Sequence, residues 1–363
     1  MKHFRPHETS VGVEAWRGLA AWMVVYVHFW GFSGHDWLTL RFAHTGVDLF
    51  FVLSGFVFAP YLWGKALSPK AFALRRFFRI YPAYVLALAV YVGLKLQAGH
   101  APLHVWEHLT FFQVQSREMA FYYNPPFWSL PAEVEFYLTL PVLAWSLRKV
   151  RRAWVGLLLM ALALRVVLGH SGDPVSQDAA YILNFHLPGM GVEFLLGSLA
   201  WRLAQIALHL GWRVLLVLAG LAGWLGLAVW FGEVGDAGVN GSLLKGQMGA
   251  LAALCFAPMV AGSLGTSHSS ASLSTHVGPR LSRPWHAAAL WAGRLSYGVY
   301  LFHMAALQMV QPWRETLAQH GPLGPQGLAV LLTLLMAWVC YWLWEEPWRQ
   351  FGRRKAAQFG ATN

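Results

Sequence analysis

The chain has 363 residues, of which 57% are hydrophobic and only 12% charged, whereas soluble domains carry roughly 25% charged residues. This composition excludes an ordinary soluble domain and indicates that lipid surrounds much of the chain. The formal net charge of +11 would suggest a nucleic acid partner in a soluble protein. The basic residues lie between apolar stretches, however, so membrane topology explains them and we expect no nucleic acid partner.

Ten apolar segments are long enough to cross a bilayer as helices. They cover residues 12–32, 45–64, 78–97, 131–147, 153–170, 188–205, 212–231, 243–262, 287–310 and 326–346. Because these runs are too long and too uniformly apolar for barrel strands, we predict an all-α polytopic membrane protein with about ten transmembrane helices. We expect one membrane domain over residues 1–363, with a transmembrane bundle at 11–350 and a cytoplasmic tail at 351–363.

The Lys and Arg residues between these segments predict the orientation, because cytoplasmic loops are enriched in them. If the N-terminus lies inside, most of the 27 Lys and Arg fall on the inner side. The predicted outer loops then hold only Arg41, Arg117 and Arg314. Both termini are therefore predicted to be cytoplasmic, and the Ser-rich stretch 263–286 is predicted to be a cytoplasmic loop.

The first two segments carry ionisable residues, which are costly in lipid and often mark function. Arg17 and His28 lie eleven residues apart, so they share a helix face about 16 Å apart along the axis. Asp48 begins the second segment, where we expect it near the depth of His28. A carboxylate beside this imidazole would fix its tautomer and raise its basicity. Alternatively, Arg17 reaches lipid headgroups, His28 is a structural histidine and Asp48 caps its helix.

Later segments add arginines at the predicted inner end and acids and a histidine toward the predicted outer end. Arg76 and Arg79 share a helix face at the inner surface. Two guanidiniums there suit a phosphate-bearing ligand. The enrichment of Lys and Arg on the cytoplasmic side of membrane proteins also predicts arginines at this position. Glu133 lies at the outer end of the fourth segment. Glu193 in the sixth segment and His303 in the ninth lie at similar depth, where each could equally form a structural hydrogen bond.

Three histidines in the longest predicted outer loop, His100, His104 and His108, are spaced four residues apart. On one helix face this spacing could bind zinc. We prefer the interpretation of a solvated outer loop, and we predict no metal site.

These motifs together resemble the acyltransferase-3 family of bacterial membrane acyltransferases, and the resemblance extends from about residue 11 to 350. The matching motifs are Arg17-x10-His28, Asp48 to Phe56, Arg76-x2-Arg79, Trp128-Ser129-Leu130 with Glu133 and Phe136-Tyr137, Ser296-Tyr297 to His303, and Glu345-x-Pro347. Where many relatives have two adjacent acids, this sequence reads Glu133, Val134, Glu135.

The resemblance implies transfer of an acyl group, expected to be acetyl, from cytoplasmic acyl-CoA to a hydroxyl of an extracytoplasmic glycan or related acceptor. It implies a multi-pass protein of the bacterial inner membrane, with acyl-CoA as a substrate and no tightly bound cofactor. His28 would act as general base or acyl carrier. The predicted catalytic residues are His28, Asp48 and Glu133. The predicted donor-binding residues are Arg17, Arg76 and Arg79. The predicted supporting residues are Ser54, Glu193, Tyr297 and His303.

Two other functions fit part of the pattern. A proton-coupled transporter or flippase of a small polar or lipid-linked substrate would also use buried arginines, histidines and acids. It does not account for two inner arginines combined with outer histidines and acids. A non-catalytic scaffold would have no need of His28 within the membrane.

Overall fold

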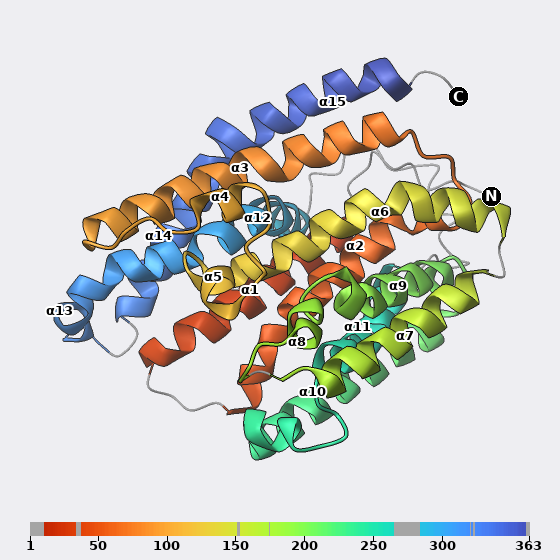
Figure 1. Ribbon diagram of the computed structural model, residues 1–363, viewed down its shortest axis with the longest axis horizontal. Helices are drawn as coiled ribbons and strands as arrows, with labels where there is room; N and C mark the ends of the chain where they lie inside the picture. Colours follow the sequence, from red (N-terminus) through yellow and green to blue (C-terminus); the bar gives the residue numbers. More distant parts are fainter. Residues whose placement is uncertain are drawn as a thin grey trace.

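The computed structural model describes residues 11–33, 38–150, 153–173, 175–264, 284–319, 321 and 324–360, and these are helical without any strand. Each of the ten predicted segments overlaps one helix. These helices are α1 (Val11–Ser33), α2 (Gly46–Leu62), α3 (Pro69–Gln97), α6 (Ser129–Lys149), α7 (Ala153–Ser171), α9 (Leu187–Ala204), α10 (Leu210–Asn240), α11 (Met248–Leu264), α12 (Pro284–Val310) and α14 (Gly324–Cys340). Figure 1 shows α3 next to one edge of the bundle and α7 and α10 on the opposite side.

Short helices occupy the connections between the long ones. They are η1 (Leu38–Thr45), α4 (Val105–Leu109), α5 (Arg117–Phe121), η2 (Pro125–Trp128), α8 (Ala179–Leu183), η4 (Gln311–Trp313) and α13 (Arg314–Ala318). The predicted loop 263–286 lies mostly outside the described residues. The short helix η1 leads directly into α2, and the second predicted segment, 45–64, matches α2 to within two residues at each end.

Five helical stretches are long and apolar enough to cross a membrane by length and composition. They are Arg41–Leu62, Pro69–Gln97, Ala153–Ser171, Leu210–Asn240 and Gly324–Phe359. This finding confirms a helical membrane protein. The number of ten crossings and the cytoplasmic position of both termini stay predictions.

The last of these stretches continues past the predicted bundle. After α14, the π-turn η5 (Tyr341–Glu345) leads into α15 (Glu346–Gly360), which packs along α3 (Figure 1). The Phe78 ring stacks on Trp348 with centroids 5.7 Å apart. The part of the predicted tail that is described, up to Gly360, is therefore a helix attached to the first half of α3.

Glycines allow two pairs of helices to approach closely, as is common between helices in lipid. A Cβ added to Gly55 of α2 would lie 1.9 Å from the Phe194 carbonyl oxygen of α9, and one added to Gly197 would lie 1.9 Å from the Val52 carbonyl oxygen. Along α1 and α12, a Cβ at Gly18 would lie 2.6 Å from the Ala292 Cβ. Any larger residue would force these helices apart.

Helices α1 and α12 run in the same direction. Glu14 near the start of α1 lies beside Gly293 of α12, and His28 near its end lies beside His303. At one level the Glu14 side chain therefore lies against the α12 backbone at Gly293, and at the other level His28 and His303 face each other.

Candidate active site

A cavity with about 730 Å³ of empty space, part of it open to the outside, lies between α1, α2, α3, α6 and α12. Its lining includes six of the ten predicted site residues: Arg17, Ser54, Arg76, Arg79, Glu133 and Tyr297. The structure thus brings all three predicted donor-binding arginines to one cavity. His28, Asp48, Glu193 and His303 do not line it.

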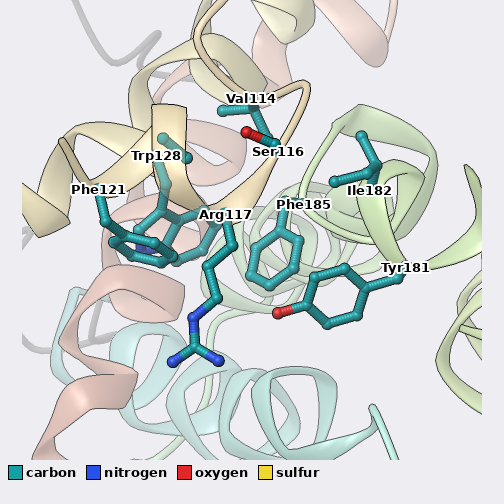
Figure 2. Close-up of a pocket in the computed structure, with 9 residues that line it drawn as sticks. Val114, Ser116, Arg117, Phe121, Trp128, Tyr181, Ile182 and Phe185 are labelled. Atoms are coloured by element: carbon teal, nitrogen blue, oxygen red, sulfur yellow. The ribbon is translucent and has the colours of Figure 1, made fainter. Parts of the chain in front are cut away.

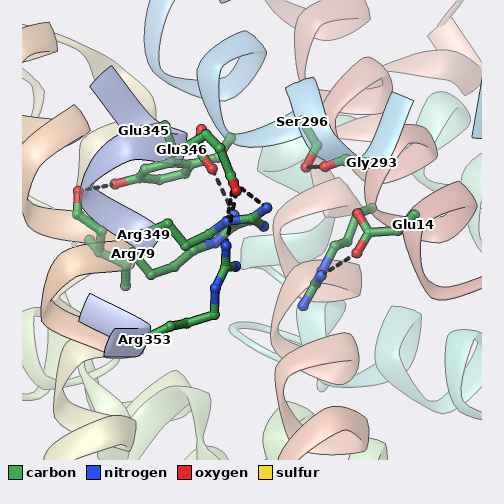
Figure 3. A network of polar contacts seen from close by, with 11 residues as sticks. Glu14, Arg79, Gly293, Ser296, Glu345, Glu346, Arg349 and Arg353 are labelled. Atoms are coloured by element: carbon green, nitrogen blue, oxygen red, sulfur yellow. Dashed lines mark hydrogen bonds and ion pairs between the residues drawn. The ribbon is translucent and has the colours of Figure 1, made fainter. Parts of the chain in front are cut away.

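Two of the three arginines form ion pairs with buried carboxylates. Arg17 Nη1 lies 2.8 Å from Glu14 Oε1, and Arg79 Nη1 lies 2.7 Å from Glu345 Oε1. Figure 3 shows Glu345 and Glu346 facing Arg79, Arg349 and Arg353. The charges of Arg17 and Arg79 are therefore largely balanced within the protein.

Arg76 differs from the other two arginines. Its guanidinium lies over the Phe58 ring at 5.1 Å, and its Nε is buried without a hydrogen-bond partner. Among the described residues no carboxylate forms an ion pair with it. A buried cation that faces a cavity without a counter-charge suits an incoming anion.

Hydroxyl groups surround the carboxylate in the cavity. Ser54 Oγ donates a hydrogen bond to Glu133 Oε1 at 3.1 Å, and the Tyr137 hydroxyl donates to the same oxygen. Tyr137 lies one helical turn after Glu133, so the two side chains share a face of α6. Tyr297 lines the cavity, but its hydroxyl donates to the Ile80 carbonyl at 3.0 Å.

Tyr300 and Phe50 also line the cavity, and their ring centroids lie 5.7 Å apart. The Tyr300 hydroxyl donates to the Pro126 carbonyl at 2.5 Å and lies 2.6 Å from Ser129 Oγ. Beyond this ring, the His303 centroid is 6.3 Å from that of Tyr300. Tyr300 therefore lies next to both the cavity and His303.

His28 and His303 contact each other, with 3.3 Å between His28 Nδ1 and His303 Nε2. His303 Nδ1 faces the Val299 and Tyr300 carbonyls at 3.1 and 3.0 Å, so it carries a proton and leaves Nε2 as an acceptor. His28 Nδ1 then donates to His303 Nε2 and to the Val24 carbonyl at 2.8 Å. In the neutral ring these bonds leave the lone pair on His28 Nε2.

The expected pair of Asp48 and His28 is not formed in the described structure. A Cβ added to Gly46 would lie 2.6 Å from the Ala20 carbonyl oxygen. Helix α2 therefore begins beside the middle of α1, about two helical turns before His28. A Cβ added to Gly249 would instead lie 2.3 Å from Asp48 Oδ1 and 2.9 Å from Arg165 Nη2. The predicted segment 45–64 begins within one residue of α2, so the start of the helix agrees with the sequence. The sequence does not fix how far along α1 the next helix begins, and this set Asp48 at the wrong depth.

Glu193 also belongs to this second cluster. Its Oε1 lies 3.3 Å from Arg165 Nη1, and the Arg165 guanidinium also donates to the Gly189 carbonyl at 2.8 Å. Asp48, Arg165 and Glu193 are 7%, 4% and 0% exposed. The sequence predicted Glu193 at a depth similar to that of Glu133, and the structure places it with Arg165 and near Asp48.

The three loop histidines do not share a helix face. Helix α4 begins only at Val105, and His104 before it has a left-handed backbone with φ 59°. His108 is buried and its Nδ1 donates to the His104 carbonyl at 2.9 Å. The part of the chain that the structure describes holds no group of three side chains arranged to bind a metal.

Several residues of the site were not predicted. Glu14 lies three residues before Arg17, and Tyr137 lies four after Glu133, and both spacings indicate side-chain contact on a helix. Glu345 was noticed only as part of a motif. It lies in a π-turn, an irregularity that is frequent at functional sites and is not visible in the sequence.

Comparison with known proteins identifies the family. A family model described as an acyltransferase domain matches residues 10–345. The chain is 42% identical over 90 residues to Protein 2 in picA locus of Rhizobium radiobacter, covering 23% of this chain and 45% of that protein. It is 29% identical over 175 residues to Nodulation protein 10 of Rhizobium leguminosarum bv. viciae, covering 40% and 47%.

These matches span less than half the length of either curated relative. No solved structure matches the chain. The family model, by contrast, extends from the first described helix to the end of η5 and includes every helix that lines the large cavity. The chain therefore belongs to the acyltransferase-3 family.

Proposed function

We propose that this protein transfers an acyl group, with acetyl expected, from cytoplasmic acyl-CoA to a hydroxyl of an extracytoplasmic glycan or related acceptor. The observation that carries this proposal is the cavity in which Arg17, Arg76 and Arg79 meet. In the orientation that the distribution of Lys and Arg favours, these arginines face the cytoplasm of a bacterial inner membrane and both chain termini are cytoplasmic.

Arg76 is the main binding group for the donor phosphates, since no carboxylate balances its charge in the described structure. Arg17 and Arg79 contribute less because Glu14 and Glu345 already form ion pairs with them. The pantetheine arm extends along the cavity past Ser54 and Tyr297 toward Tyr300. This path places the thioester at the end of the cavity nearest His28.

His28 acts through Nε2, because its Nδ1 donates to Val24 and His303. As a general base, Nε2 takes the proton of the acceptor hydroxyl while its oxygen attacks the thioester carbonyl. The carbon–sulfur bond breaks and the thiolate of CoA takes up the proton from the imidazolium. In the alternative route, Nε2 first takes the acyl group and then passes it to the hydroxyl. Both routes require Tyr300 or Phe50 to move aside.

The other site residues support this chemistry. His303 and the Val24 carbonyl hold the His28 ring in one tautomer, which is the role that the sequence assigned to Asp48. Glu133 positions the acceptor or shares in proton transfer, and Ser54 and Tyr137 hold its carboxylate. Glu193 supports the bundle through Arg165.

The test combines purified protein, labelled acetyl-CoA and envelope glycan of the same organism from which alkali has removed the ester-linked groups. We expect label in the glycan with matching release of free CoA thiol. His28→Ala should lower transfer by at least 1,000-fold and retain CoA binding. His170→Ala, an exposed histidine at the end of α7, is the matched control and should leave transfer unchanged. Normal transfer by His28→Ala would refute the proposed role, and substrate movement without CoA release would favour a transporter.

A further inference from the structure

A tyrosine of α3 binds the backbone of α12 within the turn that carries His303. The Tyr91 hydroxyl donates a hydrogen bond to the Leu301 carbonyl at 2.9 Å, and it accepts one from the Ala305 amide at 3.0 Å. In a regular α-helix, a carbonyl and the amide four residues later pair with each other. One side chain therefore bridges two backbone groups that flank His303 on either side.

A second side chain reaches the same carbonyl from a different part of the chain. Asn124 directly precedes η2, and its Nδ2 donates to the Leu301 carbonyl at 3.2 Å. Tyr91 and Asn124 are 1% and 0% exposed. The Tyr91 ring also packs against Phe127 of η2, with centroids 5.5 Å apart. The turn of α12 is thus held from α3 and from the start of η2 at one buried point.

This turn determines where the His303 ring lies. His303 Nδ1 donates to the Val299 and Tyr300 carbonyls at 3.1 and 3.0 Å. The three successive carbonyls of residues 299–301 therefore all accept hydrogen bonds from side chains. His303 Nε2 in turn faces His28 Nδ1 at 3.3 Å. A change in the pitch or rotation of the turn would move the His303 ring and remove the partner that holds His28.

The segment that includes Asn124 and η2 is anchored by aromatic packing as well. Trp128 at the end of η2, Phe121 of α5 and Phe185 after α8 gather around a small cavity between α5, η2 and α8 (Figure 2). The Trp128 ring contacts that of Phe185, with centroids 5.4 Å apart, whereas the next residue, Ser129, lines the large cavity. Asn124 is therefore a fixed support for α12 and does not simply follow it.

We propose that Tyr91, supported by Asn124, is a positioning residue for the reaction, because its hydroxyl sets the turn of α12 that carries His303. This inference rests on the proposed function, in which Nε2 of His28 is the base or acyl carrier. Without the hydroxyl, the Ala305 amide can pair only with the backbone of α12, so we expect the turn to approach regular helical geometry. His303 would then shift relative to His28, and the His28 ring would be free to turn.

The first test compares Tyr91→Phe with Tyr84→Phe in the purified full-length protein. Tyr84 is the matched control, because it lies on the same helix, is equally buried and donates to the His108 carbonyl at 3.0 Å, outside α12. Each variant removes one buried hydroxyl, so both should lower the unfolding temperature slightly. Only Tyr91→Phe should lower the kcat of acyl transfer, by about 10- to 100-fold, with an unchanged KM for acetyl-CoA. A wild-type kcat in Tyr91→Phe, or an equal fall in Tyr84→Phe, would overturn the proposal.

The histidine rings give a readout that does not depend on activity. With isotope-labelled histidine, NMR of the protein in detergent reports which ring nitrogen carries the proton, and His28→Ala and His303→Ala assign the two signals. The wild type should show a single tautomer at His28, protonated on Nδ1. Tyr91→Phe should show two tautomers there and a shifted His303 signal, whereas Tyr84→Phe should match the wild type. Unchanged signals in Tyr91→Phe would refute the positioning role.

Asn124→Leu supplies a test that does not require Tyr91→Phe to fold. It removes the second hydrogen bond to the Leu301 carbonyl, and it should lower kcat and leave the KM for acetyl-CoA unchanged. If Tyr91→Phe does not fold, a wild-type kcat and wild-type histidine signals in Asn124→Leu would sink the proposal.

The same data separate this inference from the proposed function. Transfer that depends on His28 but is indifferent to the Tyr91 hydroxyl would refute the positioning role alone. Absence of any acyl transfer in the wild type would refute the proposed function, whereas the histidine signals would still show whether Tyr91 holds the pair of rings in place.

Discussion

Two buried clusters in this bundle combine arginine with carboxylates, and they are built in opposite ways. Arg17, Arg76 and Arg79 face about 730 Å³ of empty space, with Glu14 and Glu345 balancing only two of them. In the second cluster a single guanidinium, that of Arg165, forms an ion pair with Glu193 and lies near the Asp48 carboxylate. No residue of this second cluster lines the large cavity or the small aromatic cavity between α5, η2 and α8.

The difference separates a binding site from a structural one. An unbalanced cation that faces open space gains most when an anion arrives from outside. A closed cluster has no route for a ligand, so its charges stabilise only one another and the helices that carry them. A Cβ at Gly249 would collide with both Asp48 and Arg165, which leaves no room even for a methyl group. We therefore expect variants of the first cluster to change binding and variants of the second to change stability.

The largest effect should come from Arg165→Gln. Removing one partner of a buried ion pair costs about 3–5 kcal/mol, because the remaining charge has no partner. Asp48 and Glu193 would be left without their cation, so we expect a clear fall in thermal stability and in the amount of folded protein in detergent. Adding Glu193→Gln should restore part of the loss. Arg148→Gln, an exposed arginine of α6, is the control. An Arg165 variant as stable as the wild type would remove the structural role assigned to this cluster.

The next effect concerns the donor. Arg76→Gln should weaken CoA binding by roughly 10- to 150-fold, since a hydrogen bond to a charged group contributes about 1.5–3 kcal/mol. Arg79→Gln should weaken it less, because Glu345 already balances Arg79. Equilibrium binding of labelled CoA measures both. Arg75→Gln is the neighbouring control, since Arg75 does not line the cavity. Equal losses in the Arg76 and Arg79 variants would contradict the idea that ion pairing decides which arginine binds the donor.

The sequence predicted the first cluster better than the second for a physical reason. Arg76 and Arg79 lie on one helix, where a spacing of three residues places side chains on one face whatever the rest of the fold does. The partners of Asp48 depend on how far along α1 the helix α2 begins, and the sequence does not fix that depth. A hydrophobicity pattern gives the extent of an apolar run but not the residue at which a helix starts beside its neighbour.

The small aromatic cavity between α5, η2 and α8 could not be predicted from the sequence, for a related reason. Its walls come from residues 114–128 and 181–185, which are short loop helices far apart in sequence. Nothing in either stretch indicates that they meet, because the contact is set by hydrogen bonds such as that between Arg117 and Gln177. Trp128 was noticed as part of a motif, but its position between two cavities follows only from the fold.

The smallest effect should come from an acid–base pair at the edge of that cavity. His186 Nδ1 donates to Glu135, and its Nε2 donates to the Val114 carbonyl at 2.9 Å. Both ring nitrogens are donors only in the imidazolium, and the hydrogen bond to Glu135 raises the pKa of His186 above its ordinary 6.5. The stabilisation that results is complete below pH 6.5 and is lost as pH rises through the raised pKa.

The unfolding temperature of the wild type should therefore fall over this window more steeply than that of Glu135→Gln. Because Glu135 remains about 33% exposed, solvent screens the pair and the shift should amount to only a few degrees. Identical pH profiles would show that His186 is neutral and that the Val114 segment is held without its charge.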